Sequence, residues 1–284
     1  MGKLVEILKL TRIEHSLLLL VAVVSAELIA GWHIGPLKLA LSLITPVFIS
    51  MAAFAINDYF DIKVDKLNHR TRPLVTGTIK PGEAINITIA SLIIGVGASA
   101  FINPGSFAIA AIFGLLALLY SYKLKEKLFW GNAYIAFSMA IPFIYGSYVA
   151  GNAVRLNILL VAIMIFLSGL AREIHGTIRD YSGDVLIRNA HTIPKKVGIK
   201  ASAYLAAILY ASAILLSIYL FAAVPPFRLN VAYGLFVFFT DAMLVYVSLI
   251  YFSRHASRYY DLARNLSLFA MGLALVAILL SPLI

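Results

Sequence analysis

The sequence contains no cysteine and little charge, and both shortages restrict what the protein can be. Without cysteine there are no disulfides and no thiolate metal ligands. Charged residues make up 13% of the 284 residues, 62% are hydrophobic, and the mean hydropathy is +0.93. A soluble domain needs far more polar surface than this. No linker, low-complexity tract or charged tail marks a second domain, so we expect a single transmembrane domain.

Long apolar stretches occur throughout the chain, and a helix of about 20 such residues crosses a bilayer. We expect an all-α integral membrane protein in which nine transmembrane helices surround a central cavity. An odd number of spans puts the two termini on opposite sides of the membrane. The expected helices cover residues 16–32, 37–57, 84–102, 105–122, 131–150, 156–175, 201–222, 229–252 and 266–283.

The basic residues predict the orientation. Of the 23 Lys and Arg, 20 lie in the N-terminal segment and in alternate loops, and the other side has only Lys38, Arg155 and Arg228. Because cytoplasmic loops carry the excess of Lys and Arg, the N-terminus is predicted in the cytoplasm and the C-terminus outside the cell membrane. The net charge of +10 is therefore interpreted as a topology signal, and no nucleic-acid partner is expected.

Residues 57–73, NDYFDIKVDKLNHRTRP, place three carboxylates directly after the second expected span. Like charges along one helical stripe repel. A hard cation such as Mg²⁺ relieves this repulsion, and the basic residues that follow suit a polyanion bridged by the metal. The alternative is a solvated loop in which acids and bases neutralise each other. If the second helix continues far enough, the stripe consists of Asn57, Asp58, Asp61 and Asp65.

A second cluster repeats this arrangement after the sixth expected span. Asp180 and Asp184 have the same DxxxD spacing, and both clusters are followed by a P-x-x-x-G segment, at residues 73–77 and 194–198. The two matched clusters contain five of the thirteen acids. They favour two metal-binding halves that face one diphosphate, with the site between the halves. The halves would cover about residues 1–125 and 126–284.

Glycines recur every seven residues on the face of the sixth span that carries the second acidic cluster. They are Gly169, Gly176 and Gly183. Small residues allow close helix packing in lipid, but they also leave room for a substrate. The sequence leaves both possibilities open.

Together these residues resemble the UbiA-type intramembrane prenyltransferases over nearly the whole chain. The first signature of that family, NDxxDxxxD, is present without mismatch as NDYFDIKVD at residues 57–65, and the second, DxxxD, at residues 180–184. The Arg-Pro pair of the family loop is found at residues 72–73. The resemblance implies a lateral opening to lipid and a prenyl diphosphate bound with Mg²⁺, as two ions, between the motifs. The implied metal ligands are Asn57, Asp61 and Asp65 on one side and Asp180 and Asp184 on the other.

The loop after the fourth expected span departs from the family pattern. Many members have Tyr-x-x-x-Lys there, whereas this sequence reads YSYKLK at residues 120–125. The available spacings run from Tyr120 to Lys123 and from Tyr122 to Lys125. Which lysine binds the diphosphate is therefore left open, with the general excess of basic residues in cytoplasmic loops as the alternative explanation.

The reaction implied by the resemblance is transfer of a prenyl group from its diphosphate to a lipophilic acceptor within the membrane. Residues 12–15, RIEH, resemble the branch that prenylates 4-hydroxybenzoate or another quinone precursor, and they slightly favour an aromatic acceptor; an interfacial anchor is their alternative. The stretch NDYFDIKVDKLN and the short chain also resemble the archaeal enzymes that transfer a geranylgeranyl group to geranylgeranylglyceryl phosphate. An ion-coupled transporter is the alternative from another class, with Glu27 and Asp241 as its mid-membrane acids.

The site expected from the sequence thus has three groups of residues. The catalytic group is Asp61, Asp65, Asp180, Asp184 and Tyr120. The metal ligands are Asn57 and the same four aspartates. The substrate-binding group is Asn57, Arg72, Lys123, Lys125, Arg179, Lys195, Arg12, Glu14 and His15.

Overall fold

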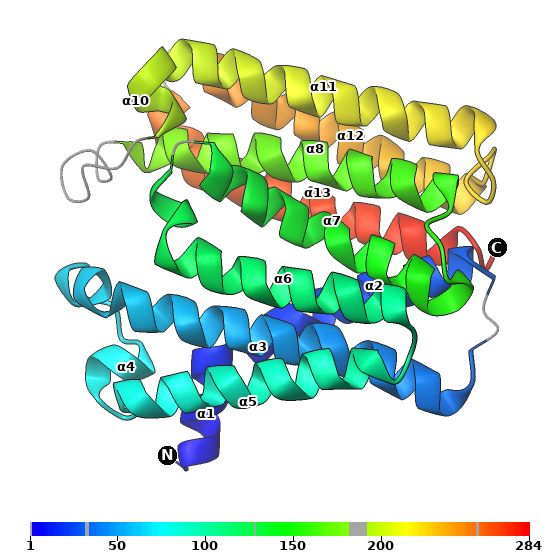
Figure 1. The fold of residues 1–284 in the computed structure, drawn as a ribbon. Helices are drawn as coiled ribbons and strands as arrows, with labels where there is room; N and C mark the ends of the chain where they lie inside the picture. Colours follow the sequence, from blue (N-terminus) through cyan, green and yellow to red (C-terminus); the bar gives the residue numbers. More distant parts are fainter. Residues whose placement is uncertain (1, 32–33, 128, 182–191, 254–255) are drawn as a thin grey trace. The chain divides into compact units, whose positions relative to one another are not determined.

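The computed structural model describes residues 2–31, 34–127, 129–181, 192–253 and 256–284, and all regular structure in these ranges is helical (Figure 1). Eight of the described helices are long and apolar enough to cross a membrane, as a multi-pass membrane protein requires. The chain forms two compact units, each described here by itself. The N-terminal unit comprises Met1–Glu27, Gly31–Leu124 and Tyr145–Ala153, and the C-terminal unit comprises Leu28–Ala30, Lys125–Ile144 and Val154–Ile284.

The N-terminal unit is built on one long helix, α3, which packs against α5 and α6. The short helix α1 packs against α3 and α4 at one end of the unit. Four of the helices, α3, α4, α5 and α6, begin with proline, whose fixed φ suits the first helical turn, where no backbone N–H is needed. The helices of this unit are α1 (Lys3–Thr11), α2 (Ile13–Ile29), α3 (Pro36–Leu67), α4 (Pro73–Thr76), α5 (Pro81–Ala100) and α6 (Pro104–Tyr122).

In the C-terminal unit, α11 packs against α8 and α12, and α12 packs against α13. The helix α8 also contacts α10 and α13, so the end of α8 has neighbours on two sides. The last residues of α7, from Tyr145 onward, belong to the N-terminal unit. The helices are η1 (Leu124–Glu126), α7 (Trp130–Gly151), α8 (Leu156–Arg179), α10 (Ile193–Val197), α11 (Ile199–Ala223), α12 (Val231–Phe252), η2 (Ala256–Tyr259) and α13 (Tyr260–Leu280).

The helix α3 continues through the first acidic cluster, as the stripe hypothesis requires. Its 32 residues correspond to a length of about 48 Å, whereas the hydrocarbon core of a bilayer is about 30 Å thick. The helix therefore extends well beyond the apolar layer. It carries Asp58, Asp61 and Asp65 in this extension, with Lys66 in its last turn.

The first expected span, residues 16–32, differs from the structure. The helix α2 has 17 residues, from Ile13 to Ile29, and is shorter than the eight helices that qualify as spans. It is separated from α1 by Arg12, whose φ of 46° lies in the left-handed region. This break turns the chain directly before α2. It also fixes where the Arg12 side chain leaves the backbone.

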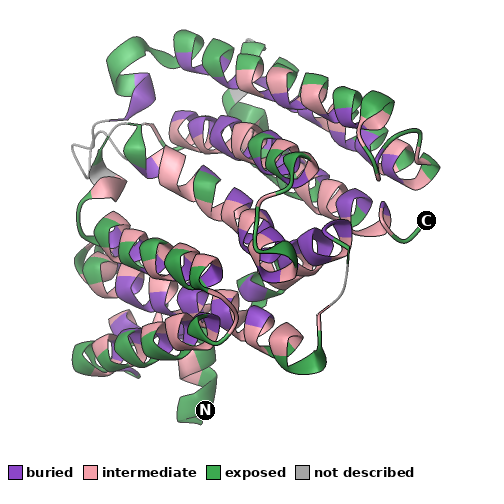
Figure 2. Ribbon diagram, turned by 45° about the vertical axis from the view of Figure 1, so that its right-hand side comes forward, coloured by how far each residue is buried: buried purple, intermediate pink, exposed green. Residues whose placement is uncertain are grey.

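The long helices are buried on one face and exposed on the other (Figure 2), and on α5 and α6 the buried residues are small, whereas large apolar side chains are exposed. Such faces let helices approach closely where lipid, not water, surrounds the large side chains. Buried hydroxyl groups bond to their own helix, as Ser121 does to the carbonyl of Ala117 at 3.0 Å. On α6 the buried positions are Ser106, Ala110, Gly114, Ala117 and Ser121.

Candidate functional site

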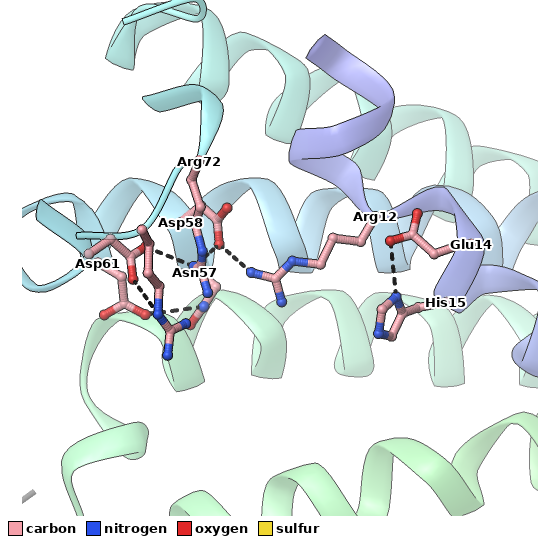
Figure 3. A network of polar contacts seen from close by, with 9 residues as sticks. Arg12, Glu14, His15, Asn57, Asp58, Asp61 and Arg72 are labelled. Atoms are coloured by element: carbon pink, nitrogen blue, oxygen red, sulfur yellow. Dashed lines mark hydrogen bonds and ion pairs between the residues drawn. The ribbon is translucent and has the colours of Figure 1, made fainter. Parts of the chain in front are cut away.

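Asp58 is the centre of a buried ion-pair cluster at the extended end of α3 (Figure 3). Its Oδ1 atom accepts from Arg72 Nη1 at 2.5 Å and from Arg12 Nη2 at 2.7 Å, and its side chain is 2% exposed. Arg12 comes from the break between α1 and α2, and Arg72 immediately precedes α4. Burial lowers the pKa of Arg12, and the Asp58 carboxylate opposes this shift; the guanidinium remains charged, since arginine does not deprotonate in proteins. The cluster joins three segments of the N-terminal unit.

Asp65 belongs to the same cluster. It is buried, it lies 2.8 Å from Arg72 Nη1, and its other oxygen is 3.8 Å from Nε of Arg70. Asp58 and Asp65 are seven residues apart, so they share one face of α3. The two guanidinium groups of Arg12 and Arg72 face these two carboxylates. Asp65, which we expected as a metal ligand, and Arg72, which we expected at the substrate, are thus paired with each other here.

Asn57 and Asp61 form a second, less buried pair on α3. The Asn57 amide donates to Asp61 Oδ2 at 3.2 Å, and both side chains are partly exposed (Figure 3). An amide oxygen and a carboxylate are ligands that suit Mg²⁺, which usually takes one or two carboxylates and completes its shell with water and phosphate oxygens. In the described ranges, no three His, Asp or Glu side chains converge as a ready-made ligand set. The expected four-residue stripe is therefore divided into a buried ion-pair face and an accessible oxygen face.

The RIEH segment does not act as one group. Arg12 points to Asp58, whereas Glu14 Oε1 lies 3.5 Å from His15 Nδ1 on well-exposed side chains (Figure 3). The Arg12 guanidinium also lies 4.7 Å from the centre of the Phe54 ring, and the His15 ring is 5.4 Å from the same phenyl group. Arg12 therefore pairs with the buried Asp58 carboxylate and not with the neighbouring Glu14.

The end of α6 lies beside the first motif. The ring of Tyr122 contacts Phe60 of α3, with centroids 5.8 Å apart, and the Lys123 ammonium lies 5.1 Å from the centre of the Tyr122 ring. Tyr120, two residues before Tyr122, is partly buried. Lys125 lies in η1 and belongs to the C-terminal unit. Of the two candidate lysines, the structure therefore associates Lys123 with the first motif.

The second motif begins where α8 ends. Asp180 caps the helix and accepts two hydrogen bonds from Arg179, at 2.7 and 2.8 Å, and its side chain is 49% exposed. Lys195 lies in α10 with an exposed side chain. Asp184 and Gly183, both predicted parts of this motif, lie outside the described residues.

The two described glycines of the α8 face have different roles. A methyl group at Gly169 would lie 3.1 Å from Met139 Sδ and 3.3 Å from the Ala136 backbone, so this glycine permits close packing of α7 and α8. A methyl group at Gly176 would meet nothing within 4 Å, because Gly176 lines a pocket beside Asp180. Gly169 therefore allows close helix packing, whereas Gly176 leaves free space in the pocket.

Some residues of these sites were missed from the sequence. The heptad spacing of Asp58 and Asp65 could have indicated a shared buried face, if the second expected helix had been extended beyond residue 57. No local signal pointed to Arg264 and Tyr251, which line the pocket of the C-terminal unit from α13 and α12.

Comparisons with known proteins agree with this fold and these motifs. The profile of the UbiA prenyltransferase family matches residues 18–269. A digeranylgeranylglyceryl phosphate synthase of Archaeoglobus fulgidus is 38% identical over 272 residues, covering 94% of this chain and 92% of the relative. A solved structure described as digeranylgeranylglyceryl phosphate synthase superimposes with a TM-score of 0.82 at 27% identity, covering 99% of both chains. A UbiA homolog from Archaeoglobus fulgidus bound to GPP and Mg²⁺ has the same fold, with a TM-score of 0.69 at 19% identity over 95% of this chain and 99% of the other. This chain belongs to the UbiA prenyltransferase family and is a prenyltransferase.

Proposed function

We propose that this enzyme transfers a geranylgeranyl group from geranylgeranyl diphosphate to geranylgeranylglyceryl phosphate. The observation that carries this proposal is the 38% identity to a digeranylgeranylglyceryl phosphate synthase across 94% of the chain. The similar structure with the same name, at a TM-score of 0.82, adds support. This acceptor is the alternative considered from the sequence, and the comparisons favour it over the aromatic quinone precursor preferred there.

The contacts of the RIEH segment support the same choice of acceptor. The preference for an aromatic acid depended on Arg12, Glu14 and His15 orienting a ring together. Arg12 is instead held by Asp58, at 2.7 Å, and this pairing offsets the positive charge that would have bound a carboxylate. The exposed Glu14 and His15 side chains then serve as an interfacial anchor.

The donor diphosphate is proposed to bind between the two aspartate motifs. Asn57 and Asp61 would hold one Mg²⁺ ion, and Asp180 and Asp184 a second. The geometry of Asn57 and Asp61 fits this role because their oxygen-bearing side chains are accessible and adjacent. Bound Mg²⁺ neutralises negative charge on the diphosphate and so makes it a better leaving group.

The protein's own residues would support the departure and capture of the prenyl group. Lys123, near the first motif, would donate to phosphate oxygens as negative charge gathers on the leaving diphosphate. Asp65 holds Arg72 in place, which fixes a cation near the same oxygens. The bond between C1 of the donor and the diphosphate oxygen breaks, and the acceptor hydroxyl oxygen bonds to C1 and releases its proton. Exclusion of water protects the allylic cation from hydrolysis.

The proposed topology has nine spans, which are the eight long helices and the shorter α2. The N-terminus and the site would face the cytoplasm, and the protein would lie in the cell membrane. The 17 residues of α2 extend about 26 Å, close to the lower limit for a span. Because the chain has no cysteine, single substitutions such as Lys127→Cys and Arg228→Cys can be labelled selectively in intact vesicles. Labelling of both from the same side would contradict this topology.

The direct test is a transfer assay with purified protein in lipid, Mg²⁺ and radiolabelled geranylgeranyl diphosphate. Geranylgeranylglyceryl phosphate, 4-hydroxybenzoate and a naphthoate are offered separately. We expect labelled product with the glyceryl phosphate lipid and none when Mg²⁺ is chelated. Product with an aromatic acid alone would overturn the proposed acceptor while leaving the enzyme class intact.

A further inference from the structure

A polar pocket of about 270 Å³ lies within the C-terminal unit, where the end of α8 faces parts of α12 and α13. Its lining has an excess of positive charge, with three guanidinium groups against two carboxylates. Asp180, from the second motif, lies in the lining, and Arg172 lies eight residues earlier on α8, about 12 Å along the helix axis. The charged residues of the lining are Arg172, Glu173, Arg179, Asp180 and Arg264.

The two carboxylates of the pocket are already engaged. Asp180 accepts both of its hydrogen bonds from Arg179, and Glu173 Oε1 accepts from Arg172 Nη1 at 3.1 Å. Arg264, an exposed residue of α13, has no ion pair within the described part of the chain. Among the described residues, the pocket therefore contains one guanidinium group without a counter-ion.

Two other groups of the pocket are buried and have no hydrogen-bond partner in the part of the chain that the structure describes. They are Nε of Arg172 and both ring nitrogens of His175, whose side chain is 3% exposed. A buried polar group without a partner costs free energy that a bound ligand can recover. An Arg Nε–H and an imidazole N–H are both donors, so the ligand that completes this pocket supplies acceptor oxygens.

The aromatic wall of the pocket holds His175 in place. The Tyr251 ring stacks on the imidazole with centroids 3.7 Å apart and an interplanar angle of 3°. The Tyr251 hydroxyl donates to the backbone carbonyl of His175 at 3.2 Å, which joins α12 to α8. The imidazole is thus restrained without using its nitrogens, as a preorganised binding group requires.

We propose that this pocket binds the phosphate group of the lipid acceptor, with Arg264, Arg172 and His175 as the donors. The proposal rests on the proposed function, since it assumes an acceptor with a phosphate monoester. A volume of about 270 Å³ with a polar, charged lining suits a phosphoglyceryl headgroup better than an apolar geranylgeranyl chain. Because the rim contains Asp180 of the donor motif, the acceptor hydroxyl would lie near the diphosphate.

The test compares wild type with Arg264→Gln, using geranylgeranylglyceryl phosphate and phosphate-free geranylgeranylglycerol as acceptors. Arg264 is exposed on its helix, so its substitution leaves the fold intact. We expect Arg264→Gln to raise the KM for the phosphate acceptor about tenfold or more, because a charge-assisted contact is lost. The KM for geranylgeranyl diphosphate and the rate with the phosphate-free alcohol should not change. Arg264→Lys should restore part of the effect.

Arg258→Gln is the matched control, since it removes the same charge from the exposed η2 segment outside the pocket. It should leave both KM values unchanged. Equal effects of Arg258→Gln and Arg264→Gln, no effect of Arg264→Gln, or an effect on the donor KM would each overturn the pocket assignment. If wild type itself transfers nothing to geranylgeranylglyceryl phosphate, the proposed function fails. If wild type and Arg264→Gln both transfer normally, the proposed function holds and only the pocket assignment fails.

Discussion

Arg72 contacts two aspartates of α3 with a single nitrogen: Nη1 donates to Asp58 at 2.5 Å and lies 2.8 Å from Asp65. This contact ties the loop after α3 back onto the helix that carries the first motif. It also explains how three acids can lie close together at the end of one helix. Two of the three are neutralised by Arg12 and Arg72, which leaves Asp61 as the accessible carboxylate.

Asp58→Asn is expected to destabilise the protein strongly. It leaves the buried ends of Arg12 and Arg72 without their shared carboxylate, and removing one partner of a buried ion pair costs about 3–5 kcal/mol. Thermal unfolding in detergent measures the effect. Arg70→Gln is the control, because its contact with Asp65 is 3.8 Å long and its side chain is 52% exposed, so the change should stay within about 0.5 kcal/mol. Equal stability of both variants would contradict the cluster's structural role.

Asp61→Asn is expected to abolish turnover without loss of stability. The carboxylate is accessible, and we assign it to the metal and the diphosphate, so the loss affects chemistry and not packing. The transfer rate and the unfolding temperature are measured on the same preparation. Near-normal turnover in Asp61→Asn, or turnover that persists in wild type after chelation of Mg²⁺, would contradict the assignment of Asp61 as a ligand of Mg²⁺. Asp180→Asn should behave like Asp61→Asn.

Much of the fold follows from the sequence because the bilayer restricts the choice of structure. Apolar stretches predicted the eight long helices, and the second DxxxD motif begins at the end of α8 as expected, whereas the first lies within α3. The end of α3 was expected at residue 57 because hydropathy falls there. The helix continues to Leu67 because Arg12, which is distant in sequence, and Arg72, from the following loop, neutralise its acids.

The remaining features of the site depend on contacts between helices. Asp58 and Asp65 looked equivalent to Asp61 by residue type, and burial alone distinguishes them. Likewise, Gly169 and Gly176 are identical in the pattern, and only the neighbours of α8 separate packing from free space. Arg264 gave no signal because, before the last expected span, one more arginine matches the general excess of basic residues between spans.

Lys123→Ala and Lys125→Ala are expected to differ. Lys123 follows Tyr122, whose ring contacts Phe60 of the first motif, so its loss should raise the KM for the prenyl diphosphate by about tenfold. Lys125 lies in the next short helix, and its loss should have a smaller effect. Donor titrations at saturating acceptor measure both values. If both substitutions change the KM for the prenyl diphosphate by the same small factor, the lysines of this loop contribute only to membrane orientation.

Gly169→Ala and Gly176→Ala should separate packing from substrate space on one helix. The added methyl group at position 169 meets Met139 Sδ at 3.1 Å and the Ala136 backbone at 3.3 Å, so the Met139 side chain and the α7 backbone must both give way slightly. Overpacking of this kind costs about 1–3 kcal/mol, and the unfolding temperature of Gly169→Ala should fall. At position 176 the methyl group has free space, and the helix gains propensity from alanine, so stability should not fall. The methyl group projects into the polar pocket instead, and the KM for the acceptor should rise. A loss of stability in Gly176→Ala with an unchanged acceptor KM would show that this face is packed and that the pocket takes no part in binding.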